Sequence, residues 1–262
     1  MQLTWMGTAA LLLRQDETTL AVDPFPGLPL EEPVDRAVPA EDRRRFQEAG
    51  HVLVTHGHFD HIQFIPALYR EKTCPVFATA TPCRTMADHG LPRERLRQIA
   101  PGERLDLGPF HIEAYQGRHC KFDLPLVRRT LLSRRALAHP ARLARLLRLN
   151  KAYDENGEIL FYEITCGTLR LQIMGSLGLD ADTAYPTGAD WLILPFQGRS
   201  DLTEYAMPLV ERLAPRGILL DHYDDAFPPM SATVDTAGFV TAAEKRLGIP
   251  CRALKKYETI TL

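Results

Sequence analysis

The sequence predicts a single α/β domain spanning residues 1–262, and three observations support this. Short apolar strands alternate with amphipathic helical segments along most of the chain. Hydrophobic residues make up 45% of the composition and charged residues 24%, which is typical of a globular protein that buries a core. A dense group of His and Asp residues directly follows one apolar run. A chain of this length suits one large domain.

The N-terminal part predicts a β-meander. Its three strands are rich in Leu, Val and Thr and are separated by small or polar residues; they cover residues 2–6, 9–14 and 18–23. Prolines at positions 24, 26, 29 and 33 then exclude regular structure, so Asp23 lies where a strand gives way to a loop. A short helix over 40–48 and a buried strand over 51–54 lead into the His and Asp group.

Strands and helices continue to alternate after this group. The predicted helices are 62–70, beginning near Asp60 or His61, then 81–89, 202–213 and 233–247. The predicted strands are 75–78, 96–99, 104–107, 109–115, 158–165, 168–174, 191–194, 217–220, 251–254 and 259–262. Three of these strands end close to polar residues of interest, namely His119, Ser176 and His222.

Residues 124–151 differ from the rest of the chain and predict a basic, Leu-rich helical insertion. The segment holds seven Arg and one Lys, and it has no Asp or Glu. Removing these eight from the 31 Lys and Arg residues leaves 23 against 33 acidic residues, so the remainder carries about −10. The charge of the chain is therefore polarised, although its formal total is only −2.

Composition also bounds the partners and the compartment. A net charge near zero gives no global attraction to nucleic acid, and we expect no nucleic-acid partner. Five cysteines, with no CxxC pair, favour reduced thiols over a disulfide framework. The first residues show no export signal, and no apolar run approaches the roughly 18 residues of a membrane span. We therefore expect a cytoplasmic protein.

The His and Asp group predicts a metal site. His56, His58, Asp60 and His61 offer four imidazole or carboxylate donors within six residues, the ligand types that divalent cations prefer. His56 and His58 leave one loop, whereas Asp60 and His61 follow the bend and reach a neighbouring point. Two adjacent cations that activate a shared water are the natural arrangement.

The segment from Thr55 to His61 resembles the signature of the metallo-β-lactamase superfamily, which are metal-dependent hydrolases with a four-layer αββα sandwich. The opening residues 4–9 and 20–24 resemble the branch that contains ascorbate-6-phosphate lactonase and N-acylphosphatidylethanolamine phospholipase D. This resemblance implies first-site ligands His56, His58 and His119. It implies second-site ligands Asp60, His61 and His222. One or two divalent ions are expected, zinc first, with manganese, iron and nickel as alternatives.

One position departs from the family pattern. Relatives place a bridging Asp where this chain has Ser176, and a neutral hydroxyl is a poor metal ligand. We therefore expect the second ion to bind more weakly, unless Asp180 or Asp182 takes the place of the missing carboxylate. A one-metal enzyme with Asp60 as general base is the alternative.

Plainer roles exist for each candidate residue. Asp60 can cap a helix, His119 can be a surface residue, and His222 can be a satisfied strand-end histidine. Asp23 either supports the ligands or caps a turn. Arg199 either lies near the substrate, as the resemblance implies, or is solvated.

We expect a hydrolase that uses a metal-activated water on a small, anionic substrate such as a phosphodiester, or a phosphate-bearing lactone or ester. The alternative is a degenerate scaffold with a binding or structural role. The basic insertion either caps the site, packs its leucines on the domain or on a second subunit, or rests on an anionic membrane surface. Oligomeric state stays open.

Overall fold

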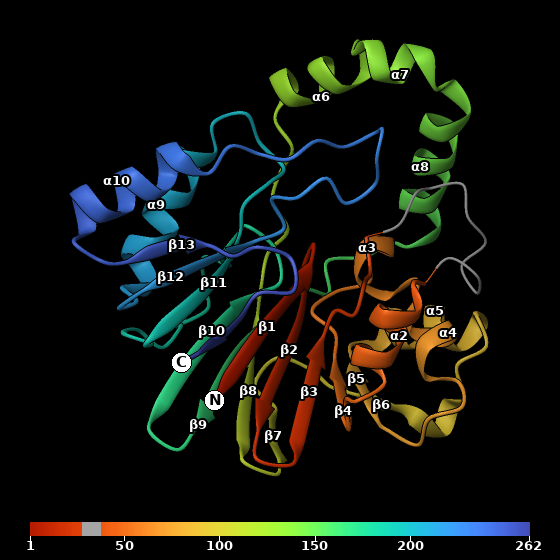
Figure 1. Cartoon of the computed structure of the whole chain (residues 1–262), viewed down its shortest axis with the longest axis vertical. Coiled ribbons are helices and arrows are strands. Elements are labelled where there is room, and N and C mark those ends of the chain that lie inside the picture. Colours follow the sequence, from red (N-terminus) through yellow and green to blue (C-terminus); the bar gives the residue numbers. More distant parts are fainter. Residues whose placement is uncertain (28–37) are drawn as a thin grey trace.

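The computed structural model describes residues 1–27 and 38–262, in which two seven-stranded sheets pack face to face (Figure 1). The first sheet has the strand order β14-β1-β2-β3-β4-β5-β6. Its strands are β1 (Gln2–Gly7), β2 (Ala10–Gln15), β3 (Thr18–Val22), β4 (His51–Leu53), β5 (Val76–Ala78), β6 (Leu96–Gln98) and β14 (Thr259–Thr261). The chain thus begins and ends in the same sheet.

The second sheet has the order β13-β12-β11-β10-β9-β8-β7. Its strands are β7 (Arg104–Leu107), β8 (Phe110–Gln116), β9 (Leu160–Cys166), β10 (Leu169–Met174), β11 (Trp191–Pro195), β12 (Ile218–Asp221) and β13 (Cys251–Ala253). Strands β10 to β13 pair in parallel, and so do β3 to β6.

Helices cover the outer face of each sheet and complete an αββα sandwich, which confirms the predicted fold class. Those on the first sheet are α2 (Ala40–Phe46), α3 (Phe59–Ile62), α4 (Ile65–Tyr69) and α5 (Ala80–Asp88), with the 3-10 helix η1 (Arg93–Arg95) before β6. Those on the second sheet are α9 (Leu202–Leu213) and α10 (Ala237–Leu247). The insertion forms α6 (Leu124–Leu131), α7 (Arg134–Ala138) and α8 (Pro140–Ala152).

Strand residues alternate between two apolar layers, as the period of a strand requires. In β2, Leu11 and Leu13 face the core between the sheets, whereas Ala10 and Leu12 face the helices outside. In β10, Leu171 and Ile173 face the inner core, and Met174 packs beneath α9 and α10. The strands are apolar on both faces because both faces are covered.

This topology brings chain segments that are distant in sequence to one edge of the sandwich. Parallel strands end on the same side, so the residues after β3 and β4 lie together, as do those after β10 and β12. The two sheets are also joined at this edge. The Leu160 N–H donates to the Thr55 carbonyl at 2.8 Å, and the Tyr162 hydroxyl donates to the Val54 carbonyl at 2.6 Å.

Some boundaries differ from the prediction. The helix expected over 62–70 begins earlier, at Phe59, and breaks into α3 and α4, because Pro66 in the first turn of α4 has no N–H with which to continue the ladder. The insertion is three helices that end at Ala152. The irregular segment expected through Pro29 and Pro33 lies outside the described residues. Within the described ranges, the helices are too short or too polar to cross a membrane.

Candidate metal centre

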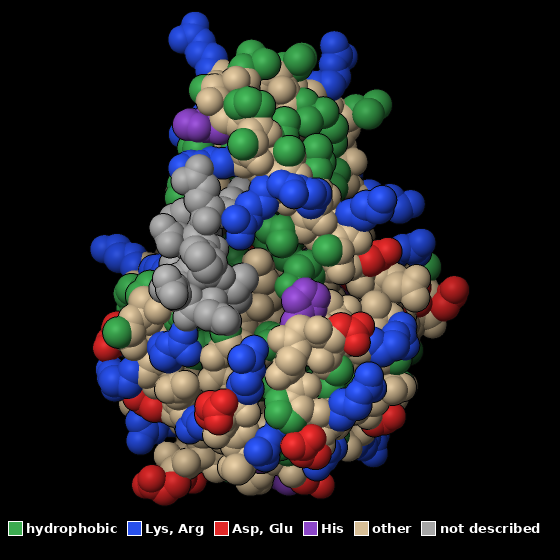
Figure 2. Space-filling view, turned by 90° about the vertical axis from the view of Figure 1, so that its right-hand side faces the viewer, with side chains coloured by type: hydrophobic (Ala, Val, Ile, Leu, Met, Phe, Trp, Pro, Cys, Tyr) green, Lys and Arg blue, Asp and Glu red, His purple; other side chains and the backbone are tan. Residues whose placement is uncertain are grey.

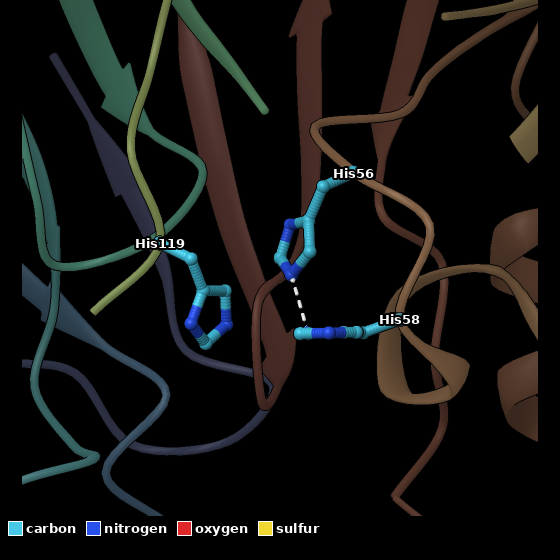
Figure 3. Close-up of side chains that lie close together, drawn as sticks. All are labelled: His56, His58 and His119. Atoms are coloured by element: carbon cyan, nitrogen blue, oxygen red, sulfur yellow. Dashed lines mark hydrogen bonds between the residues drawn. The ribbon is translucent and has the colours of Figure 1, made fainter. Parts of the chain in front are cut away.

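The first group of donors consists of His56, His58 and His119 (Figure 3). His56 and His58 leave the loop between β4 and α3, and His119 follows β8 of the other sheet. Nε2 of His56 lies 3.1 Å from Nδ1 of His58. The ring of His119 faces both, with centroids 5.5 Å from His56 and 4.6 Å from His58. The three side chains therefore surround one point between the sheets.

The second group consists of Asp60, His61 and His222. Asp60 and His61 lie in the first turns of α3, and His222 follows β12. Nε2 of His222 lies 3.3 Å from Oδ2 of Asp60, and Nε2 of His61 lies 4.0 Å from Oδ1. The His56 and His61 rings are only 3.9 Å apart between centroids, so the two groups are neighbours.

Asp23 connects the two groups from beneath. Its carboxylate is buried and accepts hydrogen bonds from the Thr55 N–H at 2.8 Å, the Thr55 hydroxyl at 2.5 Å and Nδ1 of His61 at 2.8 Å. Because the Thr55 hydroxyl donates to Asp23, its oxygen is left to accept from Nδ1 of His56, which lies 3.1 Å away. Asp23 thus places a proton on Nδ1 of His61 directly and on Nδ1 of His56 through Thr55. Both Nε2 atoms keep a free lone pair.

His119 is oriented by a different contact with the same result. Its Nδ1 donates to the carbonyl of Cys120 at 2.8 Å, which leaves Nε2 as the donor atom that faces His56 and His58. Ser176 supports this segment, since its hydroxyl oxygen accepts the Cys120 N–H at 3.0 Å. Ser176 therefore holds the backbone beside His119.

Burial sets the charge states of the imidazoles. It lowers the pKa of His56 well below the usual value, with further lowering by the surrounding histidines, and it lowers the pKa of His58. Burial and the neighbouring His58 lower the pKa of His119 to about 4. All three rings are therefore neutral near pH 7, which is the form that binds metals.

Asp60 and His222 shift each other's pKa in opposite directions. Burial alone would raise the pKa of Asp60, but His61 and the hydrogen bond from His222 outweigh burial and hold the pKa below its usual value. Burial works against a charge on His222, yet Asp60 raises its pKa overall. Asp60 is therefore an ionised carboxylate next to the imidazoles.

Both donor groups fit a divalent cation. The donor atoms within each group lie within 4.8 Å of one another. Ligands bound tetrahedrally at about 2.0–2.1 Å are about 3.3 Å apart, so small side-chain movements suffice to close around an ion. Among the described residues, Nδ1 of His222 and Oδ1 of the adjacent Asp221 are buried without a hydrogen-bond partner.

Two other predicted residues lie differently from the ligand groups. The guanidinium of Arg199 pairs with Asp201 at 2.6 Å and lies over the Tyr205 ring, and it donates to the Lys121 carbonyl at 2.9 Å. Asp180 accepts from the Thr183 hydroxyl in its own loop. Among the described residues, neither Asp180 nor Asp182 belongs to a donor group, so they do not replace the missing carboxylate.

The sequence did not reveal the hydrogen-bonding role of Thr55, the burial of Asp221 beside the site, or the close backbone contact at Gly57. The hydroxyl role of Thr55 depends on Asp23, more than thirty positions earlier, and only its place before the motif hinted at it. A Cβ on Gly57 would lie 2.9 Å from the carbonyl oxygen of Asp154, which follows α8. The end of the insertion therefore packs on the loop that carries His56 and His58.

Two seven-stranded sheets flanked by helices, with His and Asp donors gathered at one edge, define a metallo-β-lactamase fold. Comparisons with known proteins agree. Residues 18–132 match the family model described as the beta-lactamase superfamily domain. The metallo hydrolase Igni18 of Ignicoccus hospitalis superposes with a TM-score of 0.64 at 18% identity, covering 99% of this chain and 97% of that one.

Curated relatives match over a shorter stretch. A UPF0173 protein of Pyrococcus abyssi is 24% identical over 126 residues, which is 48% of this chain and 53% of the relative. A UPF0173 metal-dependent hydrolase of Pyrobaculum islandicum is 28% identical over 108 residues, 41% of this chain and 45% of the relative. The chain thus spans about half the length of the curated relatives it matches. Residues 18–132 thus resemble the beta-lactamase superfamily domain, and the chain as a whole has the metallo-β-lactamase fold.

Proposed function

We propose that the chain is a metal-dependent hydrolase in which His56, His58 and His119 hold the first divalent cation, with zinc the expected ion. Asp60, His61 and His222 would hold a second, weaker ion. The observation that carries this proposal is the meeting of six donors from both sheets in two adjacent groups. A divalent cation bound there would lower the pKa of a water and polarise the bond to be cleaved. We also propose that residues 1–262 form one domain, with 124–151 as an insertion.

The chain's own residues would orient the reaction. Asp60 is ionised and lies beside the first group, so it can accept a hydrogen bond from the attacking water in the one-metal form. A carboxylate with a depressed pKa is a weak proton acceptor, so we assign Asp60 to orientation and ligation rather than to proton storage. Asp23 would act as a positioning residue, because it is buried and its contacts are with Thr55 and His61.

The substrate we propose is a small anionic molecule, either a phosphodiester or a phosphate-bearing lactone or ester. Support comes from the seven arginines of the insertion, which begins five residues after His119 and ends against Gly57. Arginine suits phosphate because its planar donors match the oxygens of the anion.

Ser176 favours one alternative, a scaffold that binds metal weakly and hydrolyses slowly or not at all. Its hydroxyl is engaged by the Cys120 N–H and adds no negative charge between two cations. The test is to strip the protein with a chelator, add back zinc, manganese, iron or nickel, and measure hydrolysis of a phosphodiester and a phosphorylated lactone. We expect activity to disappear and return, and His58→Ala to lose the metal. Metal uptake without turnover on any anionic ester would favour the scaffold.

A further inference from the structure

The insertion presents an apolar surface that the other described residues leave exposed. Apart from Tyr257, the large hydrophobic side chains that are exposed in the described residues lie between positions 122 and 147. We call the following group the insertion face: Phe122, Leu124, Val127, Leu131, Leu132 and Leu137. Leu124, Leu132 and Leu137 are each 70% exposed or more. In Figure 2, apolar side chains gather at the end of the molecule that α6 to α8 form in Figure 1.

The face is held on a fixed support. Helix α8 packs Leu143, Leu146 and Leu149 against the core of the domain, and Ala136 of α7 is buried in the same cluster. Asp123 begins α6, accepting the Leu126 N–H at 2.9 Å through one oxygen and the Ser200 N–H at 2.9 Å through the other. Helix α6 itself buries no residue. The segment therefore has a defined conformation whose apolar side still faces solvent.

Helix α6 has the pattern of a helix that lies on a surface. Leu124, Val127 and Leu131 are spaced three and four residues apart and share one side of the helix. Arg128 lies one turn after Leu124 and borders this side, whereas Arg129 lies on the opposite side of the helix; both are exposed. An apolar side next to arginines is the arrangement of amphipathic helices that rest at the boundary of lipid headgroups and acyl chains.

Charge identifies the partner. The insertion carries eight basic residues and no acidic one, whereas the rest of the chain is acidic by about ten charges. Two copies that met through their insertion faces would bring like charges together. An anionic bilayer attracts the basic end, and the acidic body stays on the far side. In Figure 2 the acidic side chains lie away from the apolar end.

We infer that the insertion face docks the protein on an anionic lipid surface, with the apolar side of α6 in the headgroup boundary, Arg128 beside the lipid phosphates and Arg129 within range of the surface potential. This inference is independent of the proposed hydrolysis, because no metal ligand takes part. It would bring the segment that leads from His119 into α6 to the membrane surface.

The test is co-sedimentation of the full chain, in a chelator, with phosphatidylcholine vesicles that contain or lack phosphatidylserine. We expect binding to the anionic vesicles only, and release by salt. Arg128→Glu with Arg129→Glu should weaken binding by about thirtyfold or more, the effect of two basic residues at an anionic surface. Leu124→Ser with Leu131→Ser should also weaken it. Arg93→Glu with Lys245→Glu makes the same charge change on η1 and α10 and should leave binding unchanged.

Three results would overturn the inference. These are equal binding to both kinds of vesicle, no binding to either kind, and a loss of binding in the Arg93→Glu, Lys245→Glu control as large as in the Arg128→Glu, Arg129→Glu variant. Sedimentation velocity tests whether a second copy of the chain covers the face instead. A dimer that becomes a monomer in the Leu124→Ser, Leu131→Ser variant would assign the insertion face to that second copy and overturn the inference. If a variant melts early, the salt and lipid dependence of the unaltered chain decides alone. Loss of hydrolysis with vesicle binding intact would count against the proposed function only.

Discussion

Asp23→Asn should separate the arrangement of the ligands from the fold. Asp23 adopts a φ of 44°, in the left-handed region that Asn tolerates well, so the exchange keeps both shape and backbone. The amide can keep its oxygen on the Thr55 N–H, but it then points N–H groups at the Thr55 hydroxyl and at Nδ1 of His61. His61 must accept at Nδ1, which moves its proton to Nε2, the atom that faces Asp60.

The magnitude follows from the contacts that change. Two of the three hydrogen bonds to the carboxylate lose their charge-assisted character, and bonds to charged groups contribute about 1.5–3 kcal/mol each. Since the reversed contacts recover part of this, we expect a loss of about 2–4 kcal/mol, or roughly 5–15 °C in Tm for a chain of this size. Disturbing a group that orients a metal ligand lowers metal affinity by about 10–100-fold.

Differential scanning calorimetry and metal titration by calorimetry measure the two effects. The weaker equivalent of metal should be lost first, because His61 contacts Asp23 directly, and the first equivalent should weaken through Thr55 and His56. Asp16→Asn is a matched control, since Asp16 is exposed, has a φ of 51° in the turn between β2 and β3, and accepts a hydrogen bond from the side chain of the neighbouring Gln15. An Asp23→Asn protein that binds every equivalent as tightly as the unaltered chain would refute the assignment of Asp23 as a positioning residue.

Three further changes test neighbouring parts of the site. Ser176→Ala should lower the free energy of unfolding by about 1–3 kcal/mol, because the buried Cys120 N–H loses its acceptor. Ser176→Asp should raise the metal content, measured by elemental analysis, from about one to about two ions per chain. An unchanged metal content would contradict the idea that a carboxylate missing at position 176 weakens the second site. Gly57→Ala should weaken first-site binding, since its Cβ would meet the Asp154 carbonyl, while Gly238→Ala in open space should not. Burial opposes the ionisation of Glu158, but hydrogen bonds from Thr81 lower its pKa below 4.5 overall. The ionised Glu158 therefore stabilises the folded state above its pKa in the unfolded chain, and this stabilisation is lost as the pH falls through its pKa in the folded chain. The difference in Tm between the unaltered chain and Glu158→Gln should then vanish in acid. A difference that persists in acid would show that the charge of Glu158 is not its source.

The order of strands and helices could be predicted well because the strands are short, apolar and well separated, whereas the four-layer sandwich was an implication of the family resemblance. Most strand bounds were within a residue or two of those observed, since alternation and turn residues are local signals. The break between α3 and α4 was missed although Pro66 is visible in the sequence. A proline tolerated in the first turn of a helix looks the same as a proline that divides a longer one.

The candidate site could be predicted only in its donors. His56, His58, Asp60 and His61 stand in one motif, and the resemblance supplied His119 and His222. The residues that hold the ligands in place could not be predicted, because the contacts of Asp23 and Thr55 with the ligands depend on the parallel pairing of β3 with β4. Asp23 was left between two roles for this reason. Arg199 was placed near the substrate by resemblance, and only the structure shows its pairing with Asp201 and its contact with the segment after His119.

The architecture explains why this site is costly to build and still suited to a cation. Burying the rings of His56, His58 and His119 removes their hydration, which lowers their pKa values, and Nδ1 of His222 and Oδ1 of Asp221 lack a hydrogen-bond partner among the described residues. Burial also raises the pKa of Asp221 to about 8, so its carboxyl group is mostly protonated and neutral near pH 7. A ligand that binds only the folded state returns free energy in proportion to the logarithm of its concentration over Kd. Tight binding of a cation by the histidines would therefore offset the free-energy cost of burying polar imidazoles, a cost that an apolar core does not have. The same reasoning explains the fixed rings of His61, His56 and His119, because hydrogen bonds from Nδ1 to Asp23, Thr55 or a carbonyl orient these three side chains before an ion binds.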